Sequence, residues 1–251
     1  MAADRQLLRL DLSIFMLHAV MTANFVVLPL MLRDQTGLAV ESHWLLYLGV
    51  VSASIFLMVP MIIVAERHRR MKQIFLISIA LLAVAQCGLW LGAGQLWMVA
   101  LSLFLFFVGF NVLEASLPSL ISKAAPVTSK GTALGVYSTA QFLGAFAGGA
   151  LGGLLLAKGG MALLFGVSMV SILVWWLIAA TMTPPPHLLT RMVNLGNIDE
   201  QQVGELTARF LQLEGVAEAV LVPADGIAYL KVDSRQFSAD ALLAMAAQLR
   251  R

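Results

Sequence analysis

Six long apolar stretches occupy the first three quarters of the chain. They cover residues 12–32, 44–65, 74–91, 96–117, 132–157 and 161–182. A helix needs about 20 apolar residues to cross the hydrocarbon core of a bilayer, and each stretch is close to that length or above it. Because backbone groups in lipid must be paired within the segment, and the stretches are apolar on all sides, the pattern predicts an all-α polytopic membrane bundle of six transmembrane helices.

The pattern changes after residue 183. Three consecutive prolines, Pro184 to Pro186, end the sixth helix and form a stiff spacer. The expected order beyond them is a strand (191–195), a helix capped by Asp199, two strands (216–222 and 227–233) joined by a turn, and a helix that opens at Ser238. This order predicts a small α+β domain of ferredoxin-like type that is one strand short. The predicted domains are residues 1–183 in the membrane, a Pro-rich linker at 184–190, and a cytoplasmic domain at 191–251.

Composition agrees with a membrane protein and excludes several other classes. The 251 residues are 60% hydrophobic and 12% charged, whereas a soluble domain carries roughly 25% charged residues. A net charge of +2 without a basic stripe gives no reason to expect nucleic-acid binding. The chain contains no HExxH motif, no GxSxG motif and no paired catalytic aspartates. We therefore expect neither an enzyme nor a bound metal or cofactor.

Lys and Arg are unevenly distributed between the apolar stretches. Loops on the cytoplasmic side of a membrane are enriched in these residues. With the N-terminus inside, the cytoplasmic side holds Arg5, Arg9, Arg67, Arg69, Arg70, Lys72, Lys123 and Lys130, and the outer side holds Arg33 and Lys158. We therefore expect a multi-pass membrane protein with both termini in the cytoplasm.

Glu114 lies inside the fourth apolar stretch, where a charged group costs roughly 2.5–3.5 kcal/mol on insertion scales. Asn111 precedes it by three residues and shares its helix face. Pro118 follows by four and frees the carbonyl of Glu114 from helix hydrogen bonding. A carboxylate in this position can couple proton movement to transport. The alternative is a structural role, in which Glu114 only holds a helix or loop in place by hydrogen bonds.

His18 is the second ionisable residue expected within a span. Thr22 lies one turn further along the same face. A neutral imidazole both donates and accepts, and it titrates near physiological pH. His18 and Thr22 are therefore candidates for a substrate or proton pathway, and a hydrogen-bonded structural histidine is the alternative.

The fifth stretch is rich in glycine. Gly144, Gly148 and Gly152 recur every four residues, a spacing that lets two helix backbones approach closely. These glycines are expected to pack against another helix. Tyr137 and Gln141 lie on the same side of the stretch and are further candidates for the pathway.

A charged loop follows the second stretch. It contains Glu66, Arg67, Arg69 and Arg70. One interpretation is a topology signal that keeps this loop in the cytoplasm. The other is a charge-relay loop that latches one conformation of the bundle.

Several segments resemble one transporter family. Six helices with both ends inside match one half of a major facilitator superfamily transporter. Residues 65–72 occupy the place of that superfamily's charged motif, with Glu66 for the usual Asp and Arg69 for the usual Gly. The runs GFNVLEASLPSLISKAAP (109–126) and GTALGVYSTAQFLGAFAGGALGG (131–153) are similar to the fourth and fifth helices of the C-terminal half of YajR-type efflux transporters. The run LEGVAEAVLVPADGIAYLKVD (213–233) resembles their cytoplasmic YAM domain. It is also similar to heavy-metal-associated domains, but the CxxC metal motif is missing from this chain.

The resemblance implies a proton-coupled exporter of small molecules in the bacterial inner membrane, with membrane lipid, a small-molecule substrate and protons as its partners. Transporters of this family have twice as many helices. We therefore expect the N-terminal half to be absent, and transport to require a separate six-helix half or a second copy of the chain. A second hypothesis is a membrane-anchored binding or regulatory module, whose helices are scaffold and which transports nothing itself.

Overall fold

The computed structural model describes residues 5–92, 94–183, 188–196, 199–233 and 236. The chain divides into two compact units. The first consists of Met1–Ser122 and Gly131–Pro184, and the second of Lys123–Lys130 and Pro185–Arg251.

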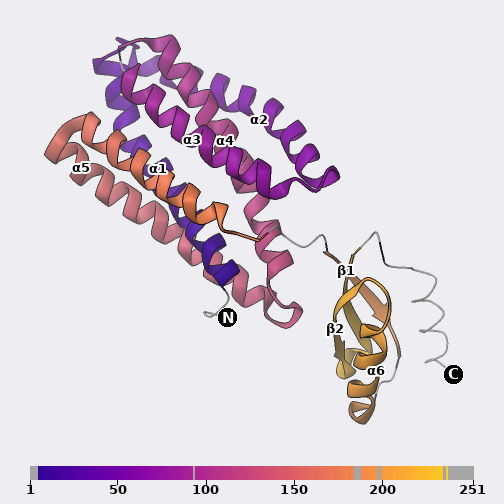
Figure 1. Ribbon diagram of the computed structural model, residues 1–251. Coiled ribbons are helices and arrows are strands. Elements are labelled where there is room, and N and C mark those ends of the chain that lie inside the picture. The colour runs from indigo at the N-terminus through magenta and orange to yellow at the C-terminus, as the bar shows by residue number, and fades with distance from the viewer. Residues whose placement is uncertain (1–4, 93, 184–187, 197–198, 234–235, 237–251) are drawn as a thin grey trace. The chain divides into compact units, whose positions relative to one another are not determined.

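The first unit is built from long apolar helices (Figure 1). They are α1 (Arg5–Asp34), α2 (His43–Arg67), α3 (Met71–Leu91), α4 (Leu96–Ala124) and α5 (Lys130–Ala180). Each of these five is long and apolar enough to cross a membrane. The helices cover all six predicted spans, and the fifth and sixth spans both fall within α5.

α5 consists of two helices that meet at a bend. Its 51 residues correspond to about 75 Å of helix, more than twice the roughly 30 Å of a bilayer core. Gly160 lies at the bend with φ 66° and ψ −164°, which is not helical. Glycine adopts a positive φ without a Cβ clash, so the chain can turn back here. The bundle therefore has six apolar passes, as the sequence predicts.

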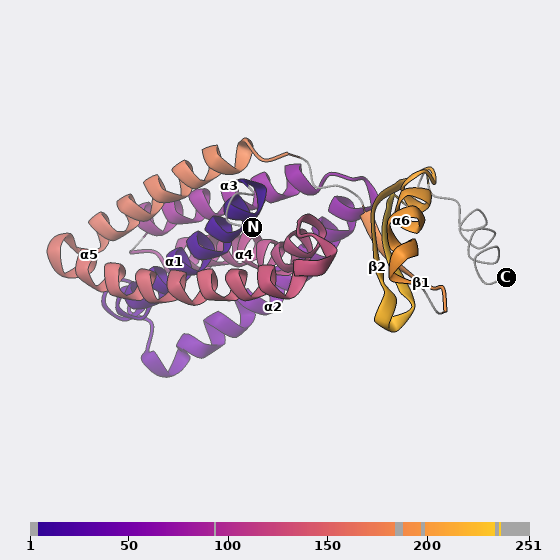
Figure 2. The same cartoon turned by 90° about the horizontal axis from the view of Figure 1, so that it is seen from below.

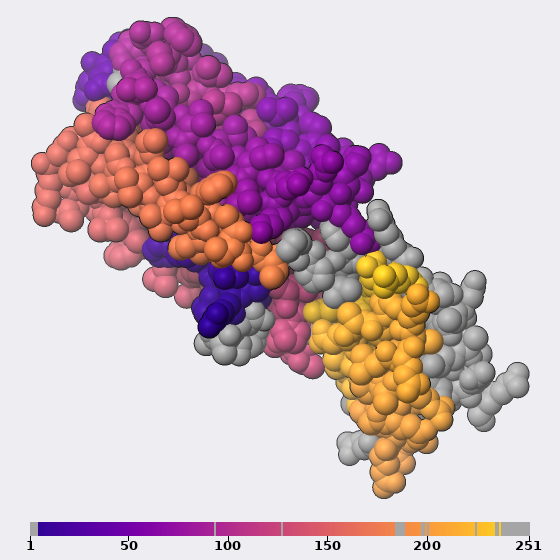
Figure 3. Space-filling view, in the orientation of Figure 1, coloured from indigo at the N-terminus to yellow at the C-terminus, as the bar shows by residue number. Residues whose placement is uncertain are grey.

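The two arms of α5 both lie beside α1 (Figure 2). In the second arm, Trp175 Nε1 donates to Ser13 Oγ on α1 at 3.0 Å, and Trp176 Nε1 donates to Leu76 O on α3 at 3.1 Å. This arm, orange in Figure 3, covers part of the face seen there. The two indole hydrogen bonds fix its position against the rest of the bundle.

The second unit contains a three-stranded antiparallel sheet and a short helix. The elements are β1 (Leu188–Asn194), α6 (Val203–Leu211), β2 (Val216–Val222) and β3 (Ile227–Asp233), and the strand order is β1-β3-β2. A turn at Pro223–Asp225 joins β2 to β3, and Gly226 follows it in the left-handed region at φ 63°. The predicted strand–helix–strand–strand order is confirmed for the described residues.

One face of this sheet and α6 enclose an apolar core. Alternation along β3 places every second side chain on the helix side. The buried core residues are Val193, Leu195, Leu206, Phe210, Leu221, Ala228, Leu230 and Val232. Asp199 caps the helical segment as expected, because its Oδ1 accepts the Gln201 N–H at 3.2 Å.

The first strand of the tail is longer than the sequence predicts. β1 begins at Leu188 rather than residue 191 and so extends into the predicted linker, because Leu188, Leu189 and Thr190 pair with Asp233, Val232 and Lys231 of β3. A strand extends as far as a partner is available, which the sequence of one strand does not reveal. The helix expected from Ser238 lies outside the described residues.

Candidate functional site

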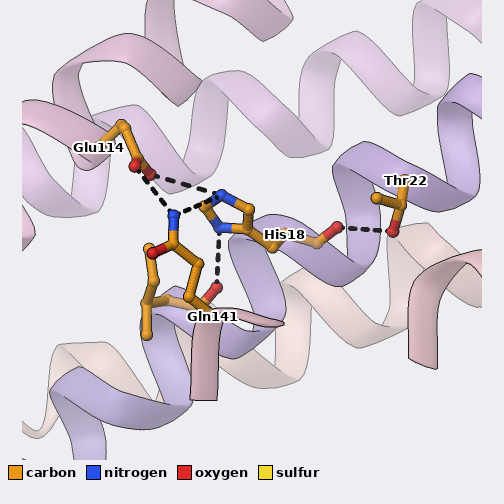
Figure 4. A network of polar contacts seen from close by, with 5 residues as sticks. His18, Thr22, Glu114 and Gln141 are labelled. Carbon is orange, nitrogen blue, oxygen red and sulfur yellow. Dashed lines mark hydrogen bonds and ion pairs between the residues drawn. The ribbon is translucent and has the colours of Figure 1, made fainter. Parts of the chain in front are cut away.

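Three polar side chains from three helices meet inside the membrane unit (Figure 4). His18 comes from α1, Glu114 from α4 and Gln141 from α5. Gln141 Nε2 lies 2.9 Å from His18 Nε2 and 3.2 Å from Glu114 Oε1. His18 Nε2 lies 3.8 Å from Glu114 Oε2. We refer to these three residues as the polar cluster.

The hydrogen bonds of the polar cluster correspond to one protonation state of the imidazole. An amide nitrogen only donates, so His18 Nε2 accepts from Gln141. The ring proton is then on Nδ1, which donates to Ile14 O at 3.3 Å. The imidazole is neutral in this arrangement, and Gln141 donates to the imidazole and the carboxylate together.

The second oxygen of Glu114 is left open. Glu114 Oε2 has almost no exposed area and accepts no hydrogen bond from the described residues, although 36% of the whole side chain is exposed. The two values are compatible because the exposed area belongs to the other atoms of the side chain. At 3.8 Å from His18 Nε2 the contact is an ion-pair distance and too long for a hydrogen bond. Oε2 is thus the atom of the cluster to which a proton can add.

Asn111 forms its side-chain hydrogen bond with another helix. Its Nδ2 donates to Ser54 Oγ on α2 at 2.8 Å, and Ser54 Oγ donates in turn to Val51 O at 2.7 Å. The sequence places Asn111 and Glu114 on one face of α4, but their side chains bond to different helices. Asn111 therefore connects α4 to α2, while Glu114 connects α4 to α1 and α5.

Thr22 lies next to the cluster on α1 (Figure 4) and also links two helices. Its hydroxyl lies 2.8 Å from His18 O and 3.0 Å from Ala145 O on α5. A hydroxyl has one proton to donate, so the two carbonyls share it. Thr22 thus fixes α5 beside the turn of α1 that carries His18.

The repeated glycines of α5 face the backbone of α1. A Cβ at Gly144 or Gly148 would collide with a carbonyl oxygen of α1, and a Cβ at Gly152 would lie 2.9 Å from a Cα. Main-chain atoms cannot rotate away as a side chain can. The α1 residues concerned are Phe15, Ala19 and Ala23. Close approach of α1 and α5 therefore depends on these glycines and brings Gln141 within reach of His18.

Tyr137 lies one turn before Gln141 on α5. Its side chain is buried, and its hydroxyl has no hydrogen-bond partner among the described residues. A buried hydroxyl without a partner costs about 1–3 kcal/mol. The hydroxyl is therefore available to a water molecule or to a polar group of a substrate.

The charged loop ends α2 with a left-handed residue. Arg69 has φ 55°, and the Arg70 N–H donates to Ala65 O at 3.0 Å. Helices commonly end with a glycine in this conformation. Arg69 occupies the position where the related charged motif carries glycine, so the backbone has kept the glycine geometry with a larger residue.

We expect Arg69→Gly to leave the protein as stable or to stabilise it by up to about 1 kcal/mol, because the left-handed conformation costs a non-glycine residue roughly that much. Arg67→Gly is the matched control. Arg67 is the last helical residue of α2, so glycine there should cost at most about 0.5–1 kcal/mol, its cost in the middle of a helix. Thermal unfolding in detergent measures both, and an equal loss in the two variants contradicts the prediction.

The sequence interpretation missed Asp11. The first span was expected to begin at residue 12, but α1 begins at Arg5 and includes Asp11. Asp11 Oδ1 is buried and has no hydrogen-bond partner among the described residues. Asp11 precedes His18 by seven residues, the spacing that repeats a helix face, and this spacing is the signal that identifies it.

A bundle of apolar helices that places ionisable groups from several helices in contact is typical of a polytopic membrane transporter. The sequence profile of the Major Facilitator Superfamily matches residues 10–224. The chain belongs to this superfamily of membrane transport proteins.

Individual relatives agree with this assignment. The chain is 39% identical to the inner membrane transport protein YajR of Escherichia coli K12 over 236 residues. The matched region covers 93% of this chain and 51% of YajR. An uncharacterized transporter of Buchnera aphidicola subsp. Baizongia pistaciae is 29% identical over 155 residues. This match covers 61% of this chain and 39% of that protein. The chain spans about half the length, or less, of these curated relatives.

The fold is also shared with a solved transporter. The crystal structure of the POT family transporter PepTSo superimposes with a TM-score of 0.62 at 16% sequence identity. The match covers 72% of this chain and 39% of that one. At this identity the likeness shows a common fold, over about two fifths of the length of that chain.

Proposed function

We propose that this chain is one six-helix half of a proton-coupled exporter of small molecules, and that the polar cluster carries the coupling proton. The observation on which this depends is the contact of His18, Gln141 and Glu114 across three helices, with Glu114 Oε2 open to a proton. Buried ionisable groups inside a membrane bundle are costly and commonly serve ion or proton movement.

Protonation changes the contacts that hold three helices together. A carboxyl protonated at Oε2 carries an O–H donor. This O–H can donate to His18 Nε2, now 3.8 Å away, if α1 and α4 approach, and it then replaces the Gln141 amide as the donor to that nitrogen. Gln141 must then rotate or withdraw with α5. A ligand shifts a conformational equilibrium only through contacts that differ between the states, and the bound proton makes such a difference here.

A second six-helix unit is needed to complete the site. The Glu114 side chain is 36% exposed on this six-helix unit, and an ionisable group that is partly exposed to lipid is costly. In transporters built from two halves, substrate binds between them near the bilayer midplane. We propose a separate N-terminal half, or a second copy of this chain, as the other wall. The E. coli relative is an inner membrane protein, which supports placement in the bacterial inner membrane, and the distribution of Lys and Arg supports an orientation with both termini in the cytoplasm.

Reconstitution with a defined partner tests this proposal. The chain is co-expressed with the N-terminal half of the E. coli relative and assembled in proteoliposomes loaded with cationic, neutral and anionic dyes. We expect at least one dye to leave the vesicles when a proton gradient is imposed, and an uncoupler to stop it. Vesicles containing either half alone are the controls.

Absence of gradient-driven efflux for every dye, despite demonstrated assembly of the two halves, would contradict the proposal. It would favour the membrane-anchored module, whose helices transport nothing. Efflux that continues in the presence of uncoupler would retain transport and exclude proton coupling.

A further inference from the structure

A continuous series of aromatic rings leads away from the polar cluster. The ring centroids of His18 and Phe110 are 5.7 Å apart, those of Phe110 and Phe107 6.3 Å, those of Phe107 and Phe25 6.3 Å, and those of Phe25 and Tyr47 5.8 Å. We call Phe110, Phe107, Phe25 and Tyr47 the aromatic track. Three helices contribute to it, since Phe25 is on α1, Tyr47 on α2 and the other two on α4.

The aromatic track and the carboxylate share one helix face. Phe110 precedes Glu114 by four residues on α4, and Phe107 precedes it by seven, so all three lie along the same stripe. Phe25 is 40% exposed, and Phe110 and Tyr47 are half-buried. The Tyr47 hydroxyl has no hydrogen-bond partner among the described residues. A ligand that contacts Glu114 can therefore also contact aromatic rings.

The lysines and arginines of helices α1 to α5 lie away from the middle of each span. They are in the first two turns or the last turn of a helix (Arg5, Arg9, Arg33, Arg67, Lys72, Lys123 and Lys130) or beside the bend of α5 (Lys158). Glu114 therefore has no lysine or arginine within the span to neutralise it. The neutral His18 and the Gln141 amide leave its negative charge uncompensated.

We propose that Glu114 and the aromatic track bind lipophilic organic monocations, which would be the substrate class of the exporter. The proposal rests on the proposed function for its role in transport, and the carboxylate and the four rings that it assigns to the cation all come from this chain. A carboxylate in a medium of low dielectric attracts a cation strongly. Aromatic faces add cation–π attraction and accept apolar substituents. An organic anion meets the same rings but is repelled by the carboxylate.

A pair of ions with the same shape and opposite charge tests the proposal. Tetraphenylphosphonium and tetraphenylborate differ mainly in the sign of their charge. Binding of each to the full chain in lipid nanodiscs is measured by equilibrium dialysis. We expect saturable binding of tetraphenylphosphonium, and for tetraphenylborate only the partition that protein-free nanodiscs also show. Equal saturable binding of the two ions, or no saturable binding of tetraphenylphosphonium, would overturn the proposal.

Variants separate the contribution of the carboxylate to cation binding from that of the aromatic rings. Glu114→Gln should weaken tetraphenylphosphonium binding at least about tenfold, and Phe110→Leu about threefold or more, whereas Phe110→Trp should retain it. Phe146→Leu and Glu41→Gln are matched controls, because Phe146 is 75% exposed on α5 away from the track and Glu41 lies in the short helix before α2. Unchanged binding in Glu114→Gln, or equal loss in Phe110→Leu and Phe110→Trp, would contradict the assignment.

The dye efflux experiment distinguishes this inference from the proposed function. Proton-driven efflux of neutral or anionic dyes alone, without saturable tetraphenylphosphonium binding, would remove the cation assignment and leave transport intact. Saturable cation binding without efflux of any dye would leave the site intact and remove the transport role.

Discussion

Glu114→Gln should reduce proton-driven efflux by the assembled transporter to the level of vesicles without protein. Glutamine has the size of the protonated carboxyl, so it keeps the packing of α4 against α1 and α5. It cannot bind or release a proton, however, and Glu114 Oε2 is the open acceptor of the polar cluster. The measurement is the initial rate of dye efflux after a pH jump in the reconstituted pair.

Glu41→Gln serves as the charge-matched control for this prediction. Glu41 lies in the short helix before α2, so its replacement should leave the rate unchanged. Glu114→Asp retains a carboxyl and should retain part of the activity. If Glu114→Gln transported at the wild-type rate with the same uncoupler sensitivity, the coupling proton would have to be carried elsewhere, and the structural role for Glu114 would stand.

Gly148→Leu should disrupt the packing of α1 against α5 and destabilise the bundle by about 3 kcal/mol or more. A Cβ at this position collides with Ala19 O and with Thr22 Oγ1. Forcing extra atoms into a packed interface typically costs 1–3 kcal/mol, and here the main chain of α1 is the obstacle, so relaxation requires helix separation. Thermal unfolding in detergent, followed by the loss of helical circular dichroism, measures the effect.

Gly149→Leu is the adjacent control. A Cβ at Gly149 meets no atom within 4 Å, so leucine there should change stability by less than about 1 kcal/mol. Equal destabilisation by the two substitutions would mean that glycine is needed for the conformation of α5 itself. The close contact with α1 would then not explain the repeat.

The sequence predicted the membrane unit well because the relevant signals are local. The length of an apolar stretch decides whether a helix can span a bilayer, and all six spans fall within α1 to α5. The paired strands of the tail could be predicted equally well, since the alternation of apolar and polar side chains is a property of each strand alone. β1 was placed too late because its first residues are strand only through pairing with β3.

The contacts within the candidate site were harder to predict. Asn111 and Glu114 share a face of α4, yet one bonds to Ser54 and the other to Gln141. Helix rotation and side-chain reach decide between such partners, and neither follows from spacing along one helix. His18 and Gln141 are 123 positions apart, so their contact could be found only from the folded bundle. The aromatic track escaped notice for the same reason.

The backbone conformation of Arg69 could be predicted from the resemblance to a motif rather than from the residue itself. The resemblance placed it where the related motif carries glycine, and the structure gives it φ 55°. The conformation could therefore have been anticipated from the motif, although arginine itself disfavours it. Asp11, by contrast, was missed because the ends of an apolar stretch do not show how far the helix continues beyond the stretch.

Direct observation of the proton on Glu114 is the most incisive measurement. Infrared difference spectra of the chain in lipid nanodiscs, recorded between neutral and acidic pH, report the stretching band of a protonated carboxyl. Every carboxyl of the chain contributes to this band on acidification. We predict one component of the band that appears in the wild type, is missing from Glu114→Gln, and shifts in His18→Gln, where the neighbouring imidazole is lost. An identical band in the wild type and Glu114→Gln would show that Glu114 does not take up the proton, and would contradict the account.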